Sequence, residues 1–269
     1  GRLGREISAK GEEELQNALV VDKVGLISSK MDALSYRMSF SIKKKSGLVL
    51  LNISLIDTRF LKDAAKIMIP VFEKRLGMGR YITISGPGTH IGDFFVPEGK
   101  TAIGTICSVT LNGIFIHAGI PVVSKFGGLL EIYQGEPHRF TQIVHYDGSS
   151  LDPLEIFIKG HMTSVSEAVQ TGRGRIGASF REIPAVALPQ VRRLVRQLES
   201  IGLGAVLMVG RPNQPLLDIP VVEGRAGIIV AGGLNPMAAV EESGIQTENL
   251  AMGALYDFSR LISYQHINL

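Results

Sequence analysis

Two stretches of the sequence decide the fold: residues 86–99, GPGTHIGDFFVPEG, and residues 211–224, RPNQPLLDIPVVEG. Identical residues recur in both at one constant spacing: Pro87 pairs with Pro212, Asp93 with Asp218, Val96 with Val221, Glu98 with Glu223, and Gly99 with Gly224. Upstream, the same spacing pairs Gly77 with Gly202 and Gly79 with Gly204. Downstream, a two-residue slip pairs Gly104, Leu111 and Asn112 with Gly227, Leu234 and Asn235. Chance similarity does not hold register through several dissimilar segments, so the sequence predicts an internal duplication.

Each copy shows apolar, β-branched runs and amphipathic stretches in the same order, which predicts the same strands and helices. In the first copy, strands are expected at residues 47–57, 81–85 and 102–107 and from residues 121–124, with helices at residues 58–76 and 111–118. Gly77 and Gly119 would end these two helices. In the second copy, strands are expected at residues 175–182, 205–209 and 226–230, with helices at residues 188–201 and 236–243.

Two βαβ units in succession are the pattern of a ferredoxin-like plait. The predicted fold class is therefore α+β, with two similar ferredoxin-like lobes preceded by a short helical linker. We expect lobe 1 over residues 36–148, a bridging helix over residues 149–170 and lobe 2 over residues 171–269. The cleft between the lobes would be the natural ligand site.

Residues 1–35 are interpreted as the tail of a truncated winged-helix domain and a linker helix. The motif KGEEEL at residues 10–15 often closes such a domain, whose helix-turn-helix would lie upstream and is absent from this chain. The apolar spacing of residues 20–38 is compatible with a connecting or dimerising helix. A solvated helix without a partner is the alternative.

The composition excludes several classes of protein. A net charge of +3 over 269 residues is by itself no nucleic-acid footprint. Cys107 is the single cysteine, which excludes an intramolecular disulfide framework and a thiolate metal cluster. The histidines His138, His145, His161 and His266 are too scattered along the sequence to predict a metal site. No apolar run approaches the roughly 18 to 20 residues of a membrane helix, so we expect a soluble, cytoplasmic protein with no membrane partner.

The segment of residues 104–119, GTICSVTLNGIFIHAG, predicts a strand that turns into a helix after Cys107. Free N–H groups and the positive end of the helix dipole would point out of this turn, beside the hydroxyls of Ser108 and Thr110. Such a turn is an anion seat for a carboxylate or phosphate. The alternative is that Ser108 or Thr110 simply caps the helix. In copy two the hydroxyls are replaced by a glycine nest at Gly232 and Gly233, which also suits an anion.

A dianionic ligand also needs cations, and two candidates follow strands. Lys125 precedes an expected bend at Gly127 and Gly128, and Arg181 lies at the end of the first strand of copy two. Arginine offers a fixed fork for a carboxylate, which lysine does not. For each of the two, an exposed surface charge is the alternative.

An enzyme acting on a small keto acid is the alternative function. Cys107 would then be the nucleophile or acid, paired with His90 or His117. A buried structural cysteine is the other interpretation, because no neighbour in the sequence would lower its pKa. Arg192, Arg193 and Arg196 form a basic stripe on a helix, which a solvated face explains.

Five segments carry a resemblance to a known family: CSVTLNG (107–113), SKFGGLLEI (124–132), SSLDPLEIFI (149–158), GRIGASFREIPA (174–185) and GGLNPMAAVEE (232–242). Over residues 19–258 the chain resembles the NrpR family of archaeal nitrogen-regulatory repressors, in which a winged-helix domain precedes one or two copies of a regulatory domain. The resemblance implies a non-enzymatic regulatory domain that binds the effector 2-oxoglutarate, which relieves repression of nitrogen-assimilation genes.

It further implies a homodimer or higher oligomer, no cofactor, and operator DNA bound only through the winged-helix domain absent here. The ligand role implied for this sequence falls on Cys107, Ser108, Thr110, Asn112 and Gly113, and less firmly on Lys125 and Arg181.

Overall fold

The computed structural model describes Ser8 and residues 25–267. The interpretation of residues 1–35 as a winged-helix tail and linker therefore lies largely outside the described residues. Within the described residues, the later part of the expected connecting segment forms helix α3 (Ile27–Arg37). In this part of the chain, no helix is long and apolar enough to span a membrane.

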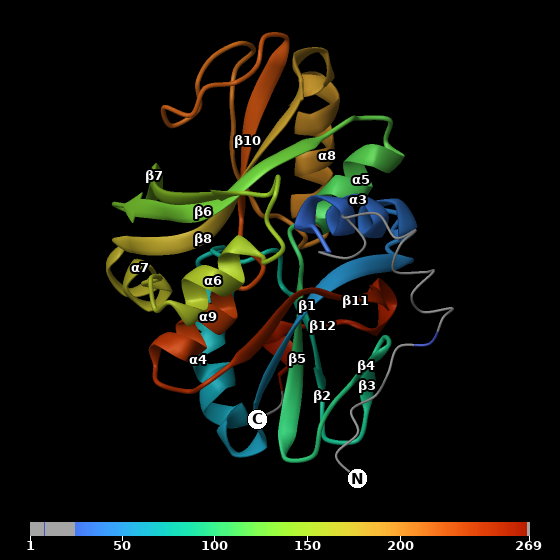
Figure 1. Ribbon diagram of the computed structural model, residues 1–269, viewed down its shortest axis with the longest axis vertical. Coiled ribbons are helices and arrows are strands. Elements are labelled where there is room, and N and C mark those ends of the chain that lie inside the picture. Colours follow the sequence, from blue (N-terminus) through green and yellow to red (C-terminus); the bar gives the residue numbers. More distant parts are fainter. Residues whose placement is uncertain (1–7, 9–24, 268–269) are drawn as a thin grey trace.

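The chain has a mixed α/β fold with antiparallel sheets (Figure 1). Sheet 1 has the strand order β11-β1-β5-β2-β12. Its strands are β1 (Leu48–Asp57), β2 (Tyr81–Ser85), β5 (Lys100–Ile106), β11 (Glu248–Asp257) and β12 (Ile262–Ser263). The apolar run of β1 is buried along almost its whole length, because the sheet is covered on both faces.

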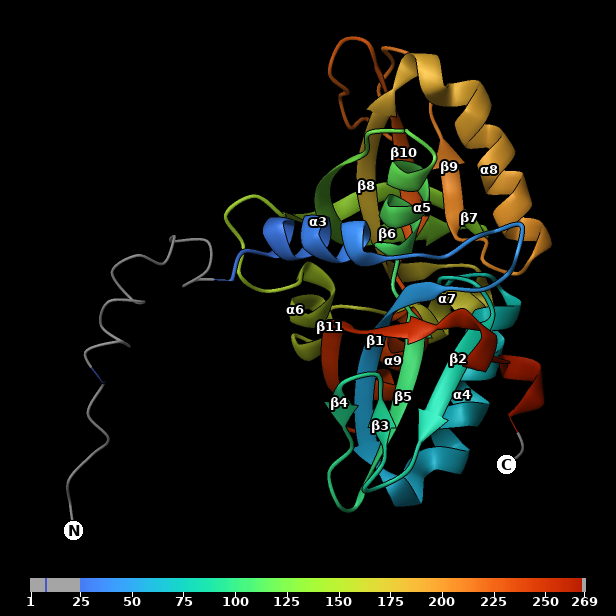
Figure 2. The ribbon, with the colours of Figure 1, turned by 90° about the vertical axis from the view of Figure 1, so that its right-hand side faces the viewer.

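Sheet 2 has the strand order β7-β6-β8-β10-β9. Its strands are β6 (Val123–Tyr133), β7 (Glu136–His145), β8 (Gly174–Pro184), β9 (Val206–Val209) and β10 (Arg225–Ala231). A small hairpin of β3 (His90–Ile91) and β4 (Phe94–Phe95) lies against sheet 1 (Figure 2). This hairpin, β7, β11 and β12 were not predicted from the sequence.

The two halves of the chain exchange their last strands. β6 follows β5 in the chain but pairs with β8 in sheet 2, and β11 follows β10 but pairs with β1 in sheet 1. The expected lobes contained four-stranded sheets, each built from one copy. The sheets instead have five strands each, and strands of both copies in both.

The helices follow the same exchange. They are α4 (Leu61–Glu73), α5 (Thr110–His117), α8 (Leu188–Ser200) and α9 (Asn235–Glu242). α4 of the first half packs against α9 of the second, and α8 of the second is joined to α5 of the first by a hydrogen bond from Gln190 Nε2 to the Ala118 carbonyl. The buried residues of α8 recur at helical spacing, as its amphipathic sequence requires: Leu188, Val191, Val195 and Leu198.

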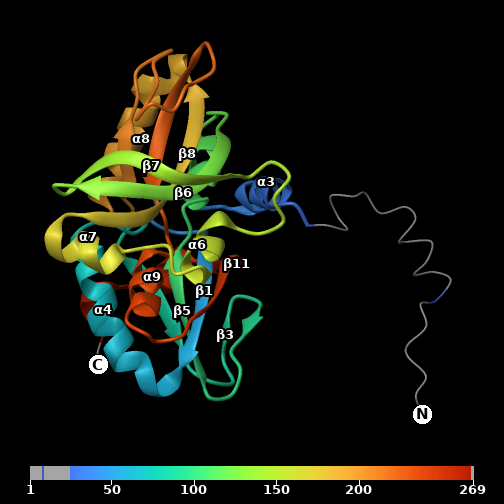
Figure 3. The same cartoon turned by 60° about the vertical axis from the view of Figure 1, so that its left-hand side comes forward.

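Residues 149–170, expected to form one bridging helix, contain most of two: α6 (Pro153–Lys159) and α7 (Val165–Thr171). Gly160 and His161 separate them. Figure 3 shows both lying between sheet 2 and the pair α4 and α9, in agreement with their contacts to β8, β11 and α9. The described residues also contain four short 3₁₀ turns: Thr58–Phe60, Ala185–Ala187, Phe258–Arg260 and Tyr264–His266.

Two local expectations are corrected. Helix α4 ends at Glu73, and Arg75, with a φ of 57°, takes the left-handed position expected at Gly77. Gly77 instead packs closely against α9, because a Cβ there would lie 3.2 Å from Cγ of Pro236. The expected two-residue slip is also wrong, since α5 begins at Thr110 and α9 at Asn235, at the spacing that relates the upstream segments.

Helix α3 lies across α5 (Figures 1 and 2). The Ile27 amide donates to the Ser149 carbonyl, and Lys30 Nζ donates to the Ala251 carbonyl, 3.3 Å away. This helix therefore touches the first half, the connection between the halves, and the exchanged strand β11.

Candidate functional site

The turn from β5 into α5 lies where the chain leaves sheet 1 and crosses to sheet 2. It brings Cys107, Ser108 and Asn112 of the first half next to Arg181 on β8 of the second half. Six of the seven residues predicted for the ligand site lie in or beside this junction. Their individual roles differ from the sequence prediction.

Arg181 is the centre of the site, and its side chain is fully buried. Its Nε donates to Asn112 Oδ1 at 2.7 Å, one terminal nitrogen to Ser179 Oγ at 2.7 Å, and the other to Ser108 Oγ at 3.1 Å. All three acceptors are neutral. Among the described residues, no carboxylate lies within 4.0 Å of this guanidinium. The surface-charge alternative for Arg181 is therefore wrong.

Asn112 and Ser108 are the residues of the first half that accept hydrogen bonds from Arg181. We call Arg181 and the side chains around it the Arg181 cluster. Asn112 accepts from Arg181 and donates through Nδ2 to Ser124 Oγ at 2.9 Å. Helix α5 has no side-chain cap, so Ser108 is not the helix cap that the alternative required. Its hydroxyl is instead held by the guanidinium.

Thr110 and Gly113 have packing roles. The Thr110 hydroxyl donates to the Leu50 carbonyl at 3.0 Å and accepts from the Leu50 amide at 3.1 Å, so it joins α5 to β1. Gly113 allows α3 to approach α5, because a Cβ there would lie 2.6 Å from Sδ of Met38 and 3.0 Å from the Ser35 carbonyl oxygen.

The expected row of free amides in the turn is largely occupied. The amides of Thr110, Leu111 and Asn112 donate to carbonyls three residues back, which tightens the start of α5 into a 3₁₀-like turn. The donors available to an anion are therefore mainly side chains, with Arg181 foremost.

Lys125 is a bulge residue of β6. The pairing of β6 with β8 shifts between Ser124 and Phe126, so Lys125 has no partner in that ladder. It is half-buried, and the structure records no hydrogen bond or ion pair of its ammonium with another described residue. The expected bend at Gly127 and Gly128 is wrong, since both lie inside β6 against close neighbours.

Two ionisable side chains, Cys107 and Tyr146, interact electrostatically with the guanidinium, and Asp152 interacts with both of them. Burial raises the pKa of the Cys107 thiol to about 12, although the charge of Arg181 opposes this shift. Burial likewise raises the pKa of Tyr146 and lowers that of Arg181. Cys107 and Tyr146 are thus neutral at pH 7 and supply no negative charge. His90 and His117 are exposed while Cys107 is buried, which weighs against a catalytic pair.

Asp152 is the acid that acts electrostatically on Tyr146 and Cys107. Burial raises its pKa from 3.8 to about 6, with neighbouring Glu155 adding to the shift and the hydrogen bond from the Leu154 amide opposing it. It lies beyond ion-pair distance of Arg181, so the guanidinium keeps an unpaired charge.

The corresponding place in the other sheet has no cation. Arg181 of β8 pairs with Ser124 of β6, and the matching pair of β1 and β11 is Ser54 with Asn249. The glycine nest expected there is filled, since a Cβ on Gly233 would meet the Ile106 carbonyl oxygen at 2.0 Å and Asn52 Nδ2 at 2.6 Å. The two junctions have therefore diverged: among the described residues, one has a buried guanidinium and the other has Ser54 and Asn249 at the matching positions.

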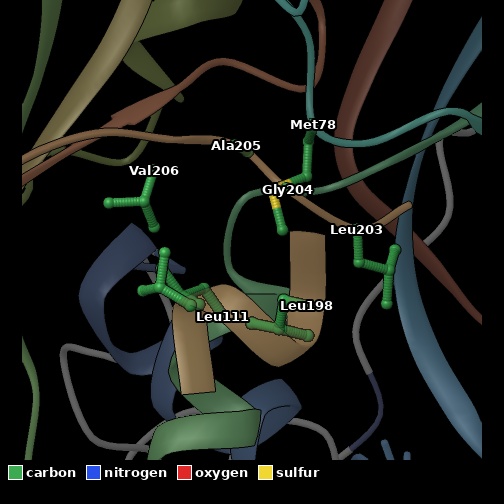
Figure 4. Close-up of a pocket in the computed structure, with 8 residues that line it drawn as sticks. Met78, Leu111, Leu198, Leu203, Gly204, Ala205 and Val206 are labelled. Carbon is green, nitrogen blue, oxygen red and sulfur yellow. The ribbon is translucent and has the colours of Figure 1, made fainter. Parts of the chain in front are cut away.

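A separate apolar pocket between α5 and α8 is closed (Figure 4). Leu111, Leu198 and Val206 converge in it, and it leaves no room for a water molecule. It belongs to the core between the halves and is no ligand site. In the described residues, no group of three or more His, Cys, Asp or Glu side chains is placed to hold a metal ion.

Four members of the Arg181 cluster were missed in the sequence: Ser124, Tyr146, Asp152 and Ser179. Ser179 had a usable signal, because residues two apart on a strand share one face. Ser124 pairs with Arg181 through the strand exchange, and Tyr146 and Asp152 reach the site from a connection, so local patterns carry no information on them.

Comparison with known proteins shows the family to which this fold belongs. The family model described as "NrpR regulatory domains NRD1 and 2" matches residues 24–263. The Global nitrogen regulator NrpRI of Methanosarcina mazei is 32% identical over 266 residues, covering 97% of this chain and 80% of that protein. The Global nitrogen regulator NrpR of Methanocaldococcus jannaschii is 33% identical over 239 residues, covering 89% of this chain and 40% of that protein. A crystal structure of a nitrogen repressor-like protein from Methanococcus jannaschii has a TM-score of 0.76 and 32% identity, covering 88% of this chain and 97% of that one.

These findings define a regulatory domain of a transcription regulator. The chain belongs to the NrpR regulatory-domain family, and its relatives are global nitrogen regulators. The resemblance found in the sequence is confirmed.

Proposed function

We propose that this chain is the effector-sensing regulatory domain of a repressor of nitrogen-assimilation genes, and that 2-oxoglutarate binds at Arg181 to relieve repression. The observation that carries the proposal is the buried guanidinium of Arg181, which meets only neutral oxygens. A buried charge without a counter-ion costs several kcal/mol, and an anionic ligand removes that cost.

The chemistry of 2-oxoglutarate suits these side chains. One carboxylate would take the guanidinium fork, with Ser108 turning its hydroxyl to donate. The second carboxylate would extend toward Lys125, next to Ser124 on the β6 bulge. Because Arg181 has no exposed surface, we infer that the Ser108 turn or the Lys125 bulge moves to admit the ligand.

The route from this site to DNA would run through α3. A ligand that shifts the start of α5 also shifts the surface at Gly113, against which Met38 of α3 is packed. Residues before α3 would carry the change to an operator-binding domain, in a homodimer or higher oligomer.

We also infer that each half descends from one ferredoxin-like unit. Four strands of sheet 1 lie in the order β11-β1-β5-β2, and four strands of sheet 2 lie in the matching order β6-β8-β10-β9. In each sheet the first of these strands comes from the other half, and the two halves have helices in matching places.

Calorimetry of the full chain with 2-oxoglutarate, glutamate and glutamine tests the effector assignment. We expect 2-oxoglutarate to bind best, and Ser108→Ala to weaken it about ten- to hundredfold, the usual effect of one lost charge-assisted contact. Arg181→Met should abolish binding, with its thermal unfolding measured in parallel to show that it is folded. Arg192→Ala, on the exposed face of α8, is the matched control and should bind as the unmodified chain does. Equal binding by Ser108→Ala and a folded Arg181→Met would refute the site.

A further inference from the structure

A polar groove lies on sheet 1. It is a surface groove of about 500 Å³, within the size range of small-molecule sites. Its polar lining comes from β2, the turn after it, β3, β11 and the 3₁₀ turn that follows β11: Thr83, Ser85, Thr89, His90, Tyr256 and Arg260. The repeated segment of residues 86–99 thus forms one wall, a role that the proposed effector site does not use.

The internal duplication supplies a control for this lining. At the spacing that pairs the two repeated segments, Thr83 corresponds to Met208, Ser85 to Gly210 and His90 to Pro215. In the second half, the corresponding region has apolar side chains, since Met208, Leu217 and Ile219 are partly buried and pack against the core of sheet 2. The repeated segment forms a short antiparallel pairing in both halves: the β3–β4 hairpin in the first half and the Leu216–Ile219 bridge in the second. The second half forms this pairing without the polar side chains of Thr83, Ser85 and His90, so those side chains are not required for folding.

The charges in the groove are of one sign. The Arg260 guanidinium stacks on the Tyr256 ring, with 5.0 Å to the centroid, and in the described part of the chain no carboxylate lies within 4.0 Å of it. The recorded hydrogen bond of the Tyr256 hydroxyl is a long one of 3.5 Å, donated by buried Thr83, so its own proton can point into the groove. None of the lining residues is acidic.

We propose that this groove binds a phosphate monoester of a small organic molecule, with Arg260, Thr83 and Tyr256 holding the phosphate. Several hydroxyl donors and a guanidinium match the three acceptor oxygens of a phosphate better than the two of a carboxylate. The ring of His90, which stacks edge-on with Phe95, and the side chains of Ile84 and Ile262 offer surface to an organic body. The groove lies on sheet 1, apart from Arg181 on sheet 2, so this ligand is distinct from the proposed effector.

Titration of the full chain with adenosine 5′-monophosphate tests the proposal, with adenosine, inorganic phosphate and 2-oxoglutarate as comparison probes. NMR signals of the His90 ring report on the groove. We expect the monophosphate to shift them, and adenosine, which lacks the phosphate, to leave them in place. Arg260→Gln should weaken the monophosphate at least about tenfold, and Thr83→Val should weaken it by a smaller factor. Arg192→Ala should bind it normally.

Three outcomes would overturn the proposal. The first is no His90 shift with either phosphate probe at millimolar concentration. The second is equal binding of the monophosphate by Arg260→Gln. The third is displacement of the monophosphate by 2-oxoglutarate, which would make the groove a carboxylate site. If Ser108→Ala no longer binds 2-oxoglutarate while the monophosphate still shifts its His90 signals, the result would support two independent sites.

Discussion

Thr110 and Asn235 hold equivalent positions in the two halves of the chain. Each is the first residue of its half's second helix, and each side chain bonds both backbone groups of one residue in the first strand of its own half. Thr110 bonds Leu50, and Asn235 bonds Gly177. Asn235 also donates to the Leu76 carbonyl at 2.6 Å, which joins the second half to the first.

Replacement of these two residues should therefore cost stability unequally. Asn235→Ala loses three buried hydrogen bonds and Thr110→Val loses two. With about 1–3 kcal/mol for each buried group left unsatisfied, we expect both to lower the free energy of unfolding, Asn235→Ala by more. Urea denaturation measures the difference. A Thr110→Val chain as stable as the unmodified one would show that the turn is not locked to β1.

Gly113→Ala tests the contact between α3 and α5. The added methyl group would lie 2.6 Å from Met38 Sδ and 3.0 Å from the Ser35 carbonyl oxygen, so α3 must shift. We expect a loss of about 1–3 kcal/mol, as for other overpacked sites. In a Met38→Ala background the same Gly113→Ala change should cost less, which a double-mutant cycle measures. Gly86→Ala, where a Cβ meets no atom within 4 Å, is the matched control and should be near neutral.

Asp152→Asn should change how stability depends on pH. The pKa of Asp152 is raised on folding, so its contribution is full below about pH 4 and is lost as the pH rises from its ordinary pKa of 3.8 to about 6. The unmodified chain should therefore lose on the order of 3 kcal/mol relative to Asp152→Asn across that window, at about 1.4 kcal/mol per unit of pKa shift. Asparagine keeps the capping bond to the Leu154 amide, so the comparison isolates the charge. Parallel denaturation curves at pH 4, 5, 6 and 7 measure it, and an unchanging difference would contradict the raised pKa.

Most of the strands and helices of each half, up to its second helix, could be predicted from the sequence, because burial and periodicity are local properties. The β3–β4 hairpin, β7, β11 and β12 were not predicted. The predicted strand at residues 47–57 is β1 within one residue, and the predicted helix at residues 188–201 is α8 within one residue. The exchange of β6 and β11 could not be predicted, since a strand has the same pattern in either sheet. The prediction of the candidate site was incomplete for the same reason. Arg181 was weighed as a charge at a strand end, and only the exchange shows that Ser124 and Asn112 enclose it.

Both halves should unfold together, because each sheet contains strands of both. Leu50→Ala in sheet 1 and Phe180→Ala in sheet 2 each empty a fully buried position, at a cost of about 2–5 kcal/mol. Calorimetry should show one transition for the part of the chain in the two sheets, and both variants should move it to lower temperature. Two separate transitions, each responding to only one variant, would contradict this coupling.

The exchanged strands also bear on how such a chain could have come into being. A single half would leave β1 or β8 without its neighbour, an exposed edge that invites pairing with another chain. It would reach a closed sheet only by joining a second copy, so its folding would depend on concentration. Residues 149–171 link the copies and replace that encounter with an intramolecular one, at a high effective concentration. Once the two partners shared one chain, they no longer had to be identical, and one junction could keep Arg181 while the other closed over Ser54.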